Sequence, residues 1–398
     1  MPALSPPGLP NRLRWDVFCQ VVDNHGDAGV AWRLCSDLAA RGQMVRLWID
    51  LPDALPEVAS ALAAPDGKVQ VRLWDSAALD ASSSLGDAPH VIVECFGCPI
   101  AMTFIAKCAR KMSEKGQKLL WINLEYLTAQ SYAERNHALP SPVANLPSNC
   151  ERFFYYPGFT PHTGGLLREE DLLPRQEAFQ RQPQPVDMVL HRLGLPPAVP
   201  GERLISLFCY EPLLLPALLH QLTSGPQLTR LLVTPGRAAQ AVRAAQQAVQ
   251  PCSKDKSEFF PLTDLHGQLS ISYLPWLPQR QYDELLWACD FNFVRGEDSL
   301  VRALWAGQPF AWHIYPQHDG AHVPKLDAFL NWLDADPAYR RFMRAWNGVN
   351  GSAQATELPP IDTAAWAVQA RMARTRLLTQ ADLVSTLFSF VRKQLNPL

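Results

Sequence analysis

The sequence predicts an α/β protein made of two similar halves, each a parallel sheet with helices packed on its faces. Short apolar stretches typical of buried strands alternate with amphipathic helical stretches along almost the whole chain. A stretch with several prolines, residues 183–200, separates two such series. The chain has 398 residues, which is too many for one ordinary domain and enough for two.

The first series opens with a strand at residues 16–22, a polar loop at 23–29 and an amphipathic helix at 30–41. Another strand at 45–49 completes the opening β-α-β unit of a doubly wound sheet. Further strands are expected at 71–74, 91–95 and 119–123. Residues 131–161 are irregular and aromatic, which is typical of a functional loop that contacts a protein. A small local core explains these aromatic residues at least as well.

The second series predicts strands at 204–209, 230–233, 271–274, 291–294 and 310–315, with helices at 281–288 and 300–306. Residues 362–393 are expected to be largely helical. The predicted division is a disordered tail at 1–11, a first domain at 12–185, a linker at 186–200 and a second domain at 201–380. Two such domains facing each other form a cleft, in which ligands bind at the carboxyl ends of the strands.

Composition narrows the class of protein. The net charge is −2 and no Lys/Arg tract is present, which argues against nucleic acid binding. No apolar run is long enough to span a bilayer, and the first eleven residues lack the apolar core of a secretory signal. The nine cysteines are scattered, which suits reduced thiols in a cytoplasm. The one close pair, Cys95 and Cys98, has no second pair or histidine partner, so we interpret it as a loop after a buried strand.

Two carboxylates, Asp23 and Asp27, flank the loop after the first strand. Gly26 and Gly29 in this loop allow a ligand to approach the backbone closely. The loop lacks the dinucleotide fingerprint, because only Gly-x-x-Gly is present. Acidic residues at this edge of a sheet indicate a general base or a receptor for a cation. Helix capping is the alternative, and it accounts for one of the two carboxylates more easily than for both.

A second polar sequence, Arg295-Gly296-Glu297-Asp298-Ser299, joins the strand at 291–294 to the helix at 300–306. A helix N-terminus binds anions, because its free N–H groups and its dipole point at the same place. Arg295 adds a positive charge and Ser299 a hydroxyl. The acidic Glu297 and Asp298 suit a guest that also carries hydroxyl groups or a developing positive charge. The alternative is a capped helix with a solvated acidic turn.

This part of the chain resembles the sugar-nucleotide site of two-domain (GT-B) glycosyltransferases. The resemblance lies in Ser299, in Ala303-Leu304 after three intervening residues, and in Gly307-x-Pro309. In those enzymes this helix holds the diphosphate of the donor. The acidic ribose ligand expected three residues after the serine is Arg302 here, so the resemblance implies that the ribose is held differently.

Five motifs in order resemble one family, the bacterial protein-arginine rhamnosyltransferases that modify elongation factor P (EarP). They are the sequence from Asp23 to Leu34, Glu125-Tyr126-Leu127, Gly164-Gly165-Leu166-x-Arg168, Arg295 to Ser299, and Trp312 to Gln317. The resemblance runs from about residue 15 to the C-terminal helix. It implies a GT-B fold of two Rossmann-like domains facing each other across a cleft, with a last helix at 381–398 that completes the first domain.

The resemblance also implies an activity. The enzyme would move L-rhamnose from dTDP-β-L-rhamnose, with inversion and without a metal or other cofactor. The acceptor would be a loop-tip arginine on the N-terminal domain of elongation factor P, whose modification relieves ribosome stalling. Neither a membrane nor a nucleic acid would be a partner.

Matched position by position, the family implies that Asp27 is the base, Asp23 its companion carboxylate, and Glu297 a support for the acceptor or transition state. Trp276 would stack on thymine and Gln279 would read the base. The whole implied donor site is Gly26, Phe208, Tyr210, Trp276, Gln279, Arg295, Asp298, Ser299 and Tyr315. His25 and Ala28 stand where the family pattern has Phe and Ile, which affects the packing of the loop rather than its carboxylates.

Two other functions remain open. One is a GT-B enzyme that uses another nucleotide sugar and a small-molecule or lipid acceptor, although no stretch resembles a membrane-binding helix. The other is a two-lobed binding protein without catalysis, which would have no need of the paired carboxylates.

Overall fold

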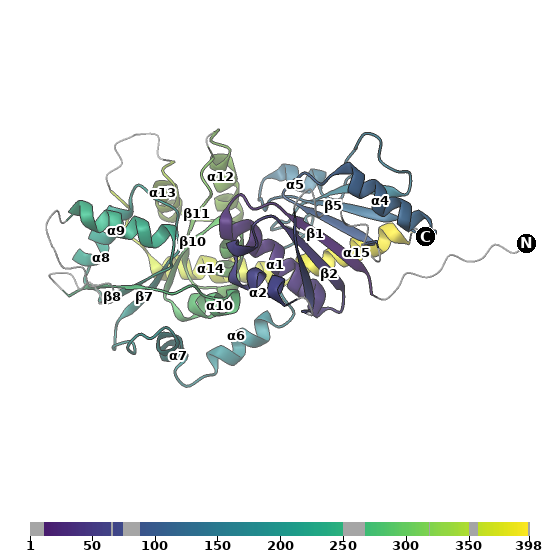
Figure 1. The fold of residues 1–398 in the computed structure, drawn as a ribbon. Coiled ribbons are helices and arrows are strands. Elements are labelled where there is room, and N and C mark those ends of the chain that lie inside the picture. The colour runs from purple at the N-terminus through teal and green to yellow at the C-terminus, as the bar shows by residue number, and fades with distance from the viewer. Residues whose placement is uncertain are drawn as a thin grey trace, which may run out of the picture. The chain divides into compact units, whose positions relative to one another are not determined.

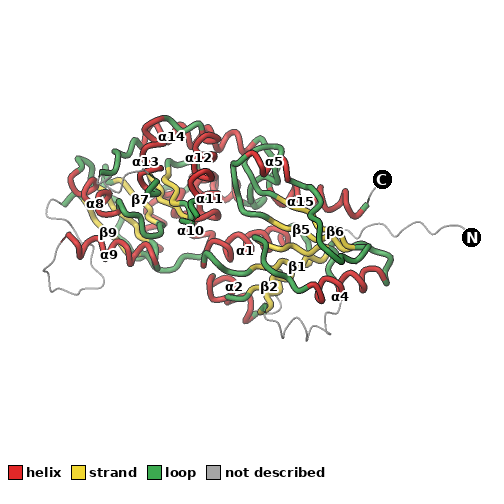
Figure 2. Tube along the Cα trace, turned by 90° about the horizontal axis from the view of Figure 1, so that it is seen from above, coloured by secondary structure: helices red, strands yellow, loops and turns green. Residues whose placement is uncertain are grey.

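The computed structural model describes residues 12–64, 67–74, 88–249, 267–317, 319–349 and 357–396. The predicted tail at 1–11 therefore lies outside the described residues. The chain forms two compact units (Figure 1). The first unit runs as far as Glu170 and resumes at Thr379, and the second spans Asp171–Leu378. Each unit contains one parallel sheet with helices around it, which confirms the predicted α/β class (Figure 2).

The first unit has a six-stranded sheet in the order β3-β2-β1-β4-β5-β6, with every neighbouring pair parallel. Its strands are β1 Arg14–Cys19, β2 Met44–Ile49, β3 Val69–Leu73, β4 Val91–Cys95, β5 Leu119–Leu124 and β6 Cys150–Tyr155. Its helices are α1 Asn24–Ala40, η1 Pro52–Ala54, α2 Pro56–Ala63, α4 Met102–Ser113, α5 Ser131–Asn136 and α15 Leu383–Leu395. The strand order reverses between β1 and β4, so the loop after β1 lies where doubly wound sheets bind ligands.

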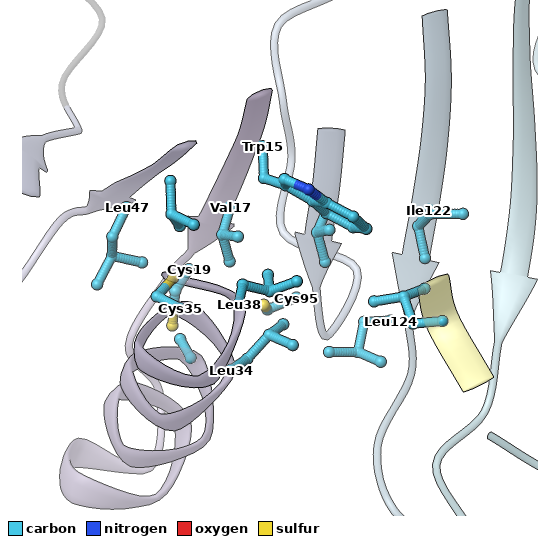
Figure 3. Packing of buried hydrophobic residues seen from close by; sticks show 14 of the residues in the cluster. Trp15, Val17, Cys19, Leu34, Cys35, Leu38, Leu47, Cys95, Ile122 and Leu124 are labelled. Atoms are coloured by element: carbon cyan, nitrogen blue, oxygen red, sulfur yellow. The ribbon is translucent and has the colours of Figure 1, made fainter. Parts of the chain in front are cut away.

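Two hydrophobic clusters cover the two faces of this sheet. Figure 3 shows part of the first, in which Leu34 and Leu38 of α1 pack with Val17 and other strand residues. Apolar residues of α15 complete this cluster: Leu383, Val384, Leu387 and Val391. The second cluster contains residues of α4 with Phe18 and Trp48. Helix packing on both faces explains why the strands read as continuous apolar runs rather than alternating ones.

The Gly164-Gly165 motif accommodates α15. The hydroxyl of Thr386 donates to the carbonyl of Gly164 at 2.6 Å. Gly165 has φ of +75°, and a Cβ there would come within 2.6 Å of the carbonyl oxygen of Ala381. A side chain at residue 165 would therefore displace the start of the C-terminal helix. This motif has a packing role.

The second unit has a five-stranded parallel sheet in the order β11-β10-β7-β8-β9. Its strands are β7 Arg203–Leu207, β8 Thr229–Val233, β9 Leu269–Tyr273, β10 Phe291–Arg295 and β11 Phe310–His313. Its helices are α6 Leu172–Gln180, α7 Pro185–Arg192, α8 Leu215–Ser224, α9 Arg237–Val249, α10 Gln279–Ala288, α11 Gly296–Ala306, α12 His322–Leu333, α13 Pro337–Trp346 and α14 Thr363–Leu378. The order reverses between β7 and β10. Phe208 and Tyr210, predicted to contact the donor, follow β7, and the predicted sequence from Arg295 to Ser299 begins at the end of β10.

The boundary between the units differs from the predicted linker at 186–200. Helix α7 occupies Pro185–Arg192, and the division falls after Glu170. Pro185 is in the first turn of α7. A backbone N–H at that position would have no partner within the helix, so proline loses no hydrogen bond there, and its fixed φ favours a helix. The amide of Gln176 donates to the carbonyl of Ala306 at 3.1 Å, which joins α6 to the second unit. The first residues of the predicted linker thus belong to a helix that begins at Pro185.

Both predicted polar loops are shorter than expected. Helix α1 begins at Asn24 rather than at residue 30, and α11 begins at Gly296 rather than at residue 300. The candidate residues are therefore in the first turns of helices. Residues 131–161, predicted to be irregular, contain α5 and β6. Phe153 and Tyr155 of β6 pack on Phe390 of α15, so the local-core interpretation is correct for these two rings.

Candidate active site

Asp27 ties the loop after β1 to the first turn of α1. Its side chain is only 3% exposed, and its Oδ2 accepts hydrogen bonds from the backbone N–H groups of Val22 at 2.9 Å and Asp23 at 2.8 Å. A carboxylate at a helix N-terminus is also stabilised by the helix dipole. Asp27 thus has the role that helix capping predicts. Its role as a base stays a prediction.

Asp23 precedes α1 and lies against Gly26. The Asp23 carbonyl accepts a hydrogen bond from the Gly26 N–H at 2.6 Å, which makes the turn tight. A Cβ on Gly26 would come within 2.7 Å of Asp23 Oδ2. A side chain at residue 26 would therefore push the Asp23 carboxylate aside. These three predicted residues, Asp23, Gly26 and Asp27, form one structure, which we call the acidic turn.

Asp50 supports the acidic turn, and the sequence analysis missed it. It directly follows β2, the neighbour of β1, and its Oδ1 accepts a hydrogen bond from the Val21 N–H at 2.9 Å. The available signal was an aspartate at the carboxyl end of the adjacent strand. Of the two positions that depart from the family pattern, Ala28 is fully buried in the core, and the side chain of His25 lies outside the described residues.

Arg295, at the end of β10, is held between two rings. Its guanidinium carbon lies 4.4 Å from the ring centroid of Phe208 and 4.6 Å from that of Tyr210. Its Nη1 donates to the carbonyl of Cys209 at 3.2 Å, and the residue is 6% exposed. Ring faces attract a guanidinium electrostatically and fix its plane. Arg295, Phe208 and Tyr210 thus lie together, and we call them the arginine clamp. Their role in donor binding stays a prediction.

The turn between β10 and α11 is closed by Ser299 and Trp312. The Ser299 hydroxyl accepts from the Arg295 N–H at 2.9 Å and donates to the Arg295 carbonyl. Gly296 has φ of +64°, and its carbonyl accepts a hydrogen bond from the indole of Trp312 at 2.8 Å. The hydroxyl predicted to touch a ligand is therefore engaged in shaping the turn. The first turn of α11, whose backbone N–H groups have no partner within the helix, comes directly after Arg295.

Glu297 forms an ion pair that the sequence did not reveal. Lys325 of α12 donates from Nζ to Glu297 Oε1 at 2.6 Å, and both side chains are mostly buried. Asp298 follows in the same first turn of α11. Arg302, which replaces the expected acidic ribose ligand, is fully buried and bonds both carboxylate oxygens of Asp283 at 2.8 Å. Arg302 therefore has a packing role.

The remaining predicted donor residues stand near the same edge of the sheet. Trp276 is 51% exposed, and a Cβ on Gly236 would meet its ring at 3.5 Å, so the indole lies on the backbone of that glycine. Tyr315 packs edge-on against Tyr210 at 5.6 Å and is partly exposed. Gln279 begins α10. An exposed indole braced by backbone is suited to stacking on a base.

Two further groups in this region were missed. His313 Nδ1 accepts a hydrogen bond from the Tyr210 N–H at 3.2 Å. Burial, and secondarily Arg295, lowers the pKa of His313 to about 3, so the ring is neutral. Arg237, at the start of α9, lies 4.8 Å from the Tyr210 ring centroid and pairs with Glu211. Its signal was a basic residue directly after the Pro235-Gly236 turn of a neighbouring strand.

Within the described part of the chain, no group of three or more His, Cys, Asp or Glu side chains is placed to hold a metal ion. Cys95 and Cys98 are buried free thiols, as the loop interpretation predicts. No helix among the described residues has the length and apolarity needed to cross a membrane.

A family model, named relatives and a solved structure indicate the same family. The family model described as Elongation-Factor P (EF-P) rhamnosyltransferase EarP matches residues 15–392. The protein-arginine rhamnosyltransferase of Pseudomonas aeruginosa is 40% identical over 395 residues, covering 94% of this chain and 98% of that protein. The Pseudomonas putida protein of the same name is 39% identical, covering 96% of this chain and 100% of that protein.

A solved structure described as the structural basis for EarP-mediated arginine glycosylation of translation elongation factor EF-P is also similar. It has a TM-score of 0.62 and 32% identity, covering 96% of this chain and all of that one. This likeness and the two parallel α/β units confirm the predicted GT-B class. That the two domains face each other across a cleft stays a prediction.

Proposed function

The chain belongs to the EarP family of protein-arginine rhamnosyltransferases, and we propose that it moves L-rhamnose from dTDP-β-L-rhamnose to an arginine of elongation factor P. It is accordingly a glycosyltransferase. One observation carries the proposal: the family match extends over residues 15–392 and so includes both the acidic turn and the arginine clamp. The proposed reaction inverts the anomeric carbon.

The arginine clamp and the start of α11 suit a departing nucleoside diphosphate. As the bond from the anomeric carbon to the phosphate oxygen breaks, negative charge develops on the diphosphate. Arg295 supplies a positive charge whose plane is fixed by Phe208 and Tyr210, and α11 supplies backbone N–H groups. Groups fixed before the reaction stabilise charge without reorganising, so the residues themselves can promote departure.

The acidic turn suits an arginine acceptor. A guanidinium is a poor nucleophile because it is protonated near neutral pH and its lone pairs are delocalised. In the proposed step Asp23 and Glu297 hold its charge, one nitrogen attacks the anomeric carbon, and Asp27 accepts the proton as the C–N bond forms. Asp27 Oδ2 accepts two backbone N–H groups, which hold the carboxylate in one orientation. A single displacement of this kind gives inversion.

We propose that Trp276 stacks on thymine and that Gln279 reads its edge. The half-exposed indole braced on Gly236 supports the first assignment, and the position of Gln279 at the start of α10 supports the second. Tyr315, beside Tyr210, is assigned to the nucleotide sugar. Asp298 is assigned to hydroxyl groups of the sugar, because it shares the first turn of α11.

The test is to incubate the protein with dTDP-β-L-rhamnose and elongation factor P and to measure the intact mass of both proteins. We expect elongation factor P to gain one deoxyhexose, located at a single arginine by fragmentation, and NMR of the product to show an α linkage. An acceptor with that arginine changed to lysine is the control. Transfer from another nucleotide sugar to a small molecule would favour the other GT-B activity, and ligand binding without transfer would favour a binding protein. Either result would refute the proposal.

A further inference from the structure

Three neighbouring strands of the first unit end side by side. The register pairs Phe18 of β1 with Glu94 of β4, and Cys95 of β4 with Leu124 of β5. The acidic turn follows β1, Phe96 follows β4, and Glu125 and Tyr126 follow β5. Strands in a sheet are about 4.8 Å apart, so the end of β5 lies roughly 10 Å from the end of β1. The Glu125-Tyr126 motif therefore lies beside the acidic turn, and the mechanism above gives it no role.

The backbone at Phe96 is held in an unusual conformation. Its φ is +60°, a left-handed value that is unfavourable for a residue other than glycine. The Phe96 N–H donates to the Leu124 carbonyl at 2.7 Å, and the Cys98 thiol donates to the Phe18 carbonyl at 3.4 Å. These bonds attach the turn to both neighbouring strands. Such strain persists at sites where the direction of a side chain matters.

The strained turn places the Phe96 ring against Tyr126. The two rings are stacked, with centroids 4.4 Å apart and planes 13° apart. Tyr126 is nevertheless 40% exposed, so the pair presents aromatic surface to solvent at the carboxyl edge of the sheet. The tyrosine is therefore held in one orientation by its stacking partner while part of its ring stays accessible.

Glu125 adds a carboxylate to this surface. Its Oε1 accepts a hydrogen bond from the buried Asn123 amide at 2.8 Å. Burial raises the pKa of Glu125. The hydrogen bond from Asn123 and the charge of Arg152 lower this pKa and so offset part of the rise. The Arg152 guanidinium itself bonds both oxygens of Glu94, and within the described residues no cation forms an ion pair with Glu125. A partly desolvated carboxylate without a paired cation gains most from an incoming positive charge.

We propose that Phe96, Glu125 and Tyr126 form an acceptor shelf that binds a basic side chain on the arginine-bearing loop of the protein substrate. The chemistry fits, because a guanidinium or ammonium group binds both a carboxylate and the face of an aromatic ring. The shelf stands beside the acidic turn, where the acceptor arginine is proposed to react. This inference rests on the proposed function, and it assigns specificity for a protein acceptor to a surface outside the catalytic carboxylates.

The test uses Glu125→Gln and Tyr126→Ala in the full-length protein. With dTDP-β-L-rhamnose saturating and elongation factor P varied, we expect each variant to raise the acceptor KM about tenfold or more. The kcat at saturating acceptor and the affinity for dTDP should change less than twofold. Tyr126→Phe keeps the stacked ring and should stay near the wild type. Glu125→Gln should also weaken the dependence of acceptor KM on salt, since it removes a charge from the contact.

Met44→Ala is the matched control. Met44 is 41% exposed, close to the value for Tyr126, but it begins β2 at the amino edge of the same sheet. It should leave the acceptor KM unchanged. An unchanged acceptor KM in both Glu125→Gln and Tyr126→Ala would overturn the shelf. So would an equal loss of dTDP affinity, which would indicate a general structural defect.

Direct titration with elongation factor P, without donor, separates the shelf from the proposed function. If the wild type binds this protein and both variants bind it more weakly, the shelf is supported even if no sugar is transferred. If transfer occurs and neither variant alters binding or KM, the proposed function stands and the shelf fails. If the wild type neither binds nor modifies elongation factor P, both proposals fail.

Discussion

The acidic turn and the arginine clamp both lie at the carboxyl ends of strands where the strand order reverses, yet they are built differently. In the first unit the carboxylate of Asp27 itself holds the loop, through two backbone N–H groups. In the second unit Ser299 closes the turn, while the charge of Arg295 is positioned by two rings and a carbonyl. In the acidic turn, Asp27 both holds the loop and is the proposed base. In the second unit these roles fall on separate residues, because Ser299 holds the turn and Arg295 supplies the charge.

This difference decides which substitutions are informative. A change at Asp27 that removes its oxygen atoms alters the loop as well as the proposed proton transfer. A change at Arg295 leaves the hydroxyl of Ser299 and the start of α11 in place. The acidic turn must therefore be tested with a substitution that keeps the shape of the aspartate side chain. Arg295 of the clamp can be replaced without removing the hydrogen bonds that close its turn.

The largest effect is expected from Asp27→Asn. Transfer should fall by at least about a hundredfold, because an amide cannot accept the proton that general base catalysis requires. The amide oxygen can still accept the N–H groups of Val22 and Asp23, so dTDP affinity and melting temperature should change little. The measurements are intact-mass turnover, dTDP titration and thermal melting. Turnover near the wild-type rate would refute the assignment of Asp27 as the base.

Asp27→Ala is the companion variant. It removes the acceptor of two backbone N–H groups, which costs about 1–3 kcal/mol where those groups become unsatisfied. We expect it to lose transfer and also to lower the free energy of unfolding, measured in urea. If Asp27→Ala were as stable as Asp27→Asn, the two hydrogen bonds would contribute nothing to the loop, and the contrast with the clamp would disappear.

Arg295→Lys should have the next largest effect. Lysine keeps the charge but lacks the planar group that lies on Phe208 and Tyr210, so we expect a loss of roughly ten- to a hundredfold in kcat/KM for the donor. Affinity for dTDP should fall with it, in contrast to Asp27→Asn. The measurement is donor kinetics at saturating elongation factor P.

Arg237→Lys is the matched control for the clamp. Arg237 also lies over the Tyr210 ring, at 4.8 Å, but it is partly exposed and paired with Glu211. We expect donor kcat/KM to change by no more than about threefold, because an exposed ion pair contributes little. An equal loss in Arg237→Lys and Arg295→Lys would show that burial within the clamp is not what makes Arg295 effective.

The sequence was sufficient for the fold class and for the two charged turns. Alternating apolar strands and amphipathic helices identified both sheets, because buried parallel strands are continuously apolar. It misplaced the starts of α1 and α11, since Gly26 and Gly296 were taken as loop residues although both lie in first helical turns. It also took residues 186–200 as a linker, although α7 occupies Pro185–Arg192 and proline is well accommodated at the start of a helix.

The partners of the site residues were beyond sequence reasoning. Asp50, Lys325 and Arg237 reach the candidate region from other strands and helices. Asp50 is 29 positions from its partner Val21 in the chain, and Lys325 is 28 positions from Glu297. No local spacing encodes such contacts, because they depend on which strands are neighbours. Phe96 was missed for another reason: its left-handed backbone is not signalled by its residue type.

Trp276→Ala sharpens the comparison on the nucleotide side. Its indole is half-exposed and rests on Gly236, so removing it should leave the fold intact. Stacking on a base contributes about 1–3 kcal/mol, which predicts dTDP binding weaker by about fivefold to a hundredfold. The affinity of Trp276→Phe for dTDP should lie between those of the wild type and Trp276→Ala. The measurement is calorimetric titration with dTDP, and an unchanged affinity would rule out stacking by this residue.

The smallest effect concerns His313, whose Nδ1 accepts the Tyr210 N–H behind the clamp. Burial lowers its pKa to about 3, against an unfolded value of about 6.5. Above pH 6.5 both states are neutral and the full stability is present. Below it the unfolded state binds a proton that the folded state does not, so stability falls as the pH falls. Between pH 7.5 and 5.0 this histidine should account for a loss of at most about 2 kcal/mol in the free energy of unfolding.

His313→Asn isolates that loss, because an asparagine oxygen can replace the Nδ1 acceptor without titrating. Urea unfolding at both pH values should show a smaller acid-induced loss in the variant than in the wild type. His162→Asn, which changes an exposed histidine in the first unit, should match the wild type. The comparison between variants matters because buried carboxyls such as Asp16, whose pKa burial raises, change stability in the opposite direction over acidic pH. An identical loss in His313→Asn and the wild type would mean that protonating this ring does not disturb the second unit.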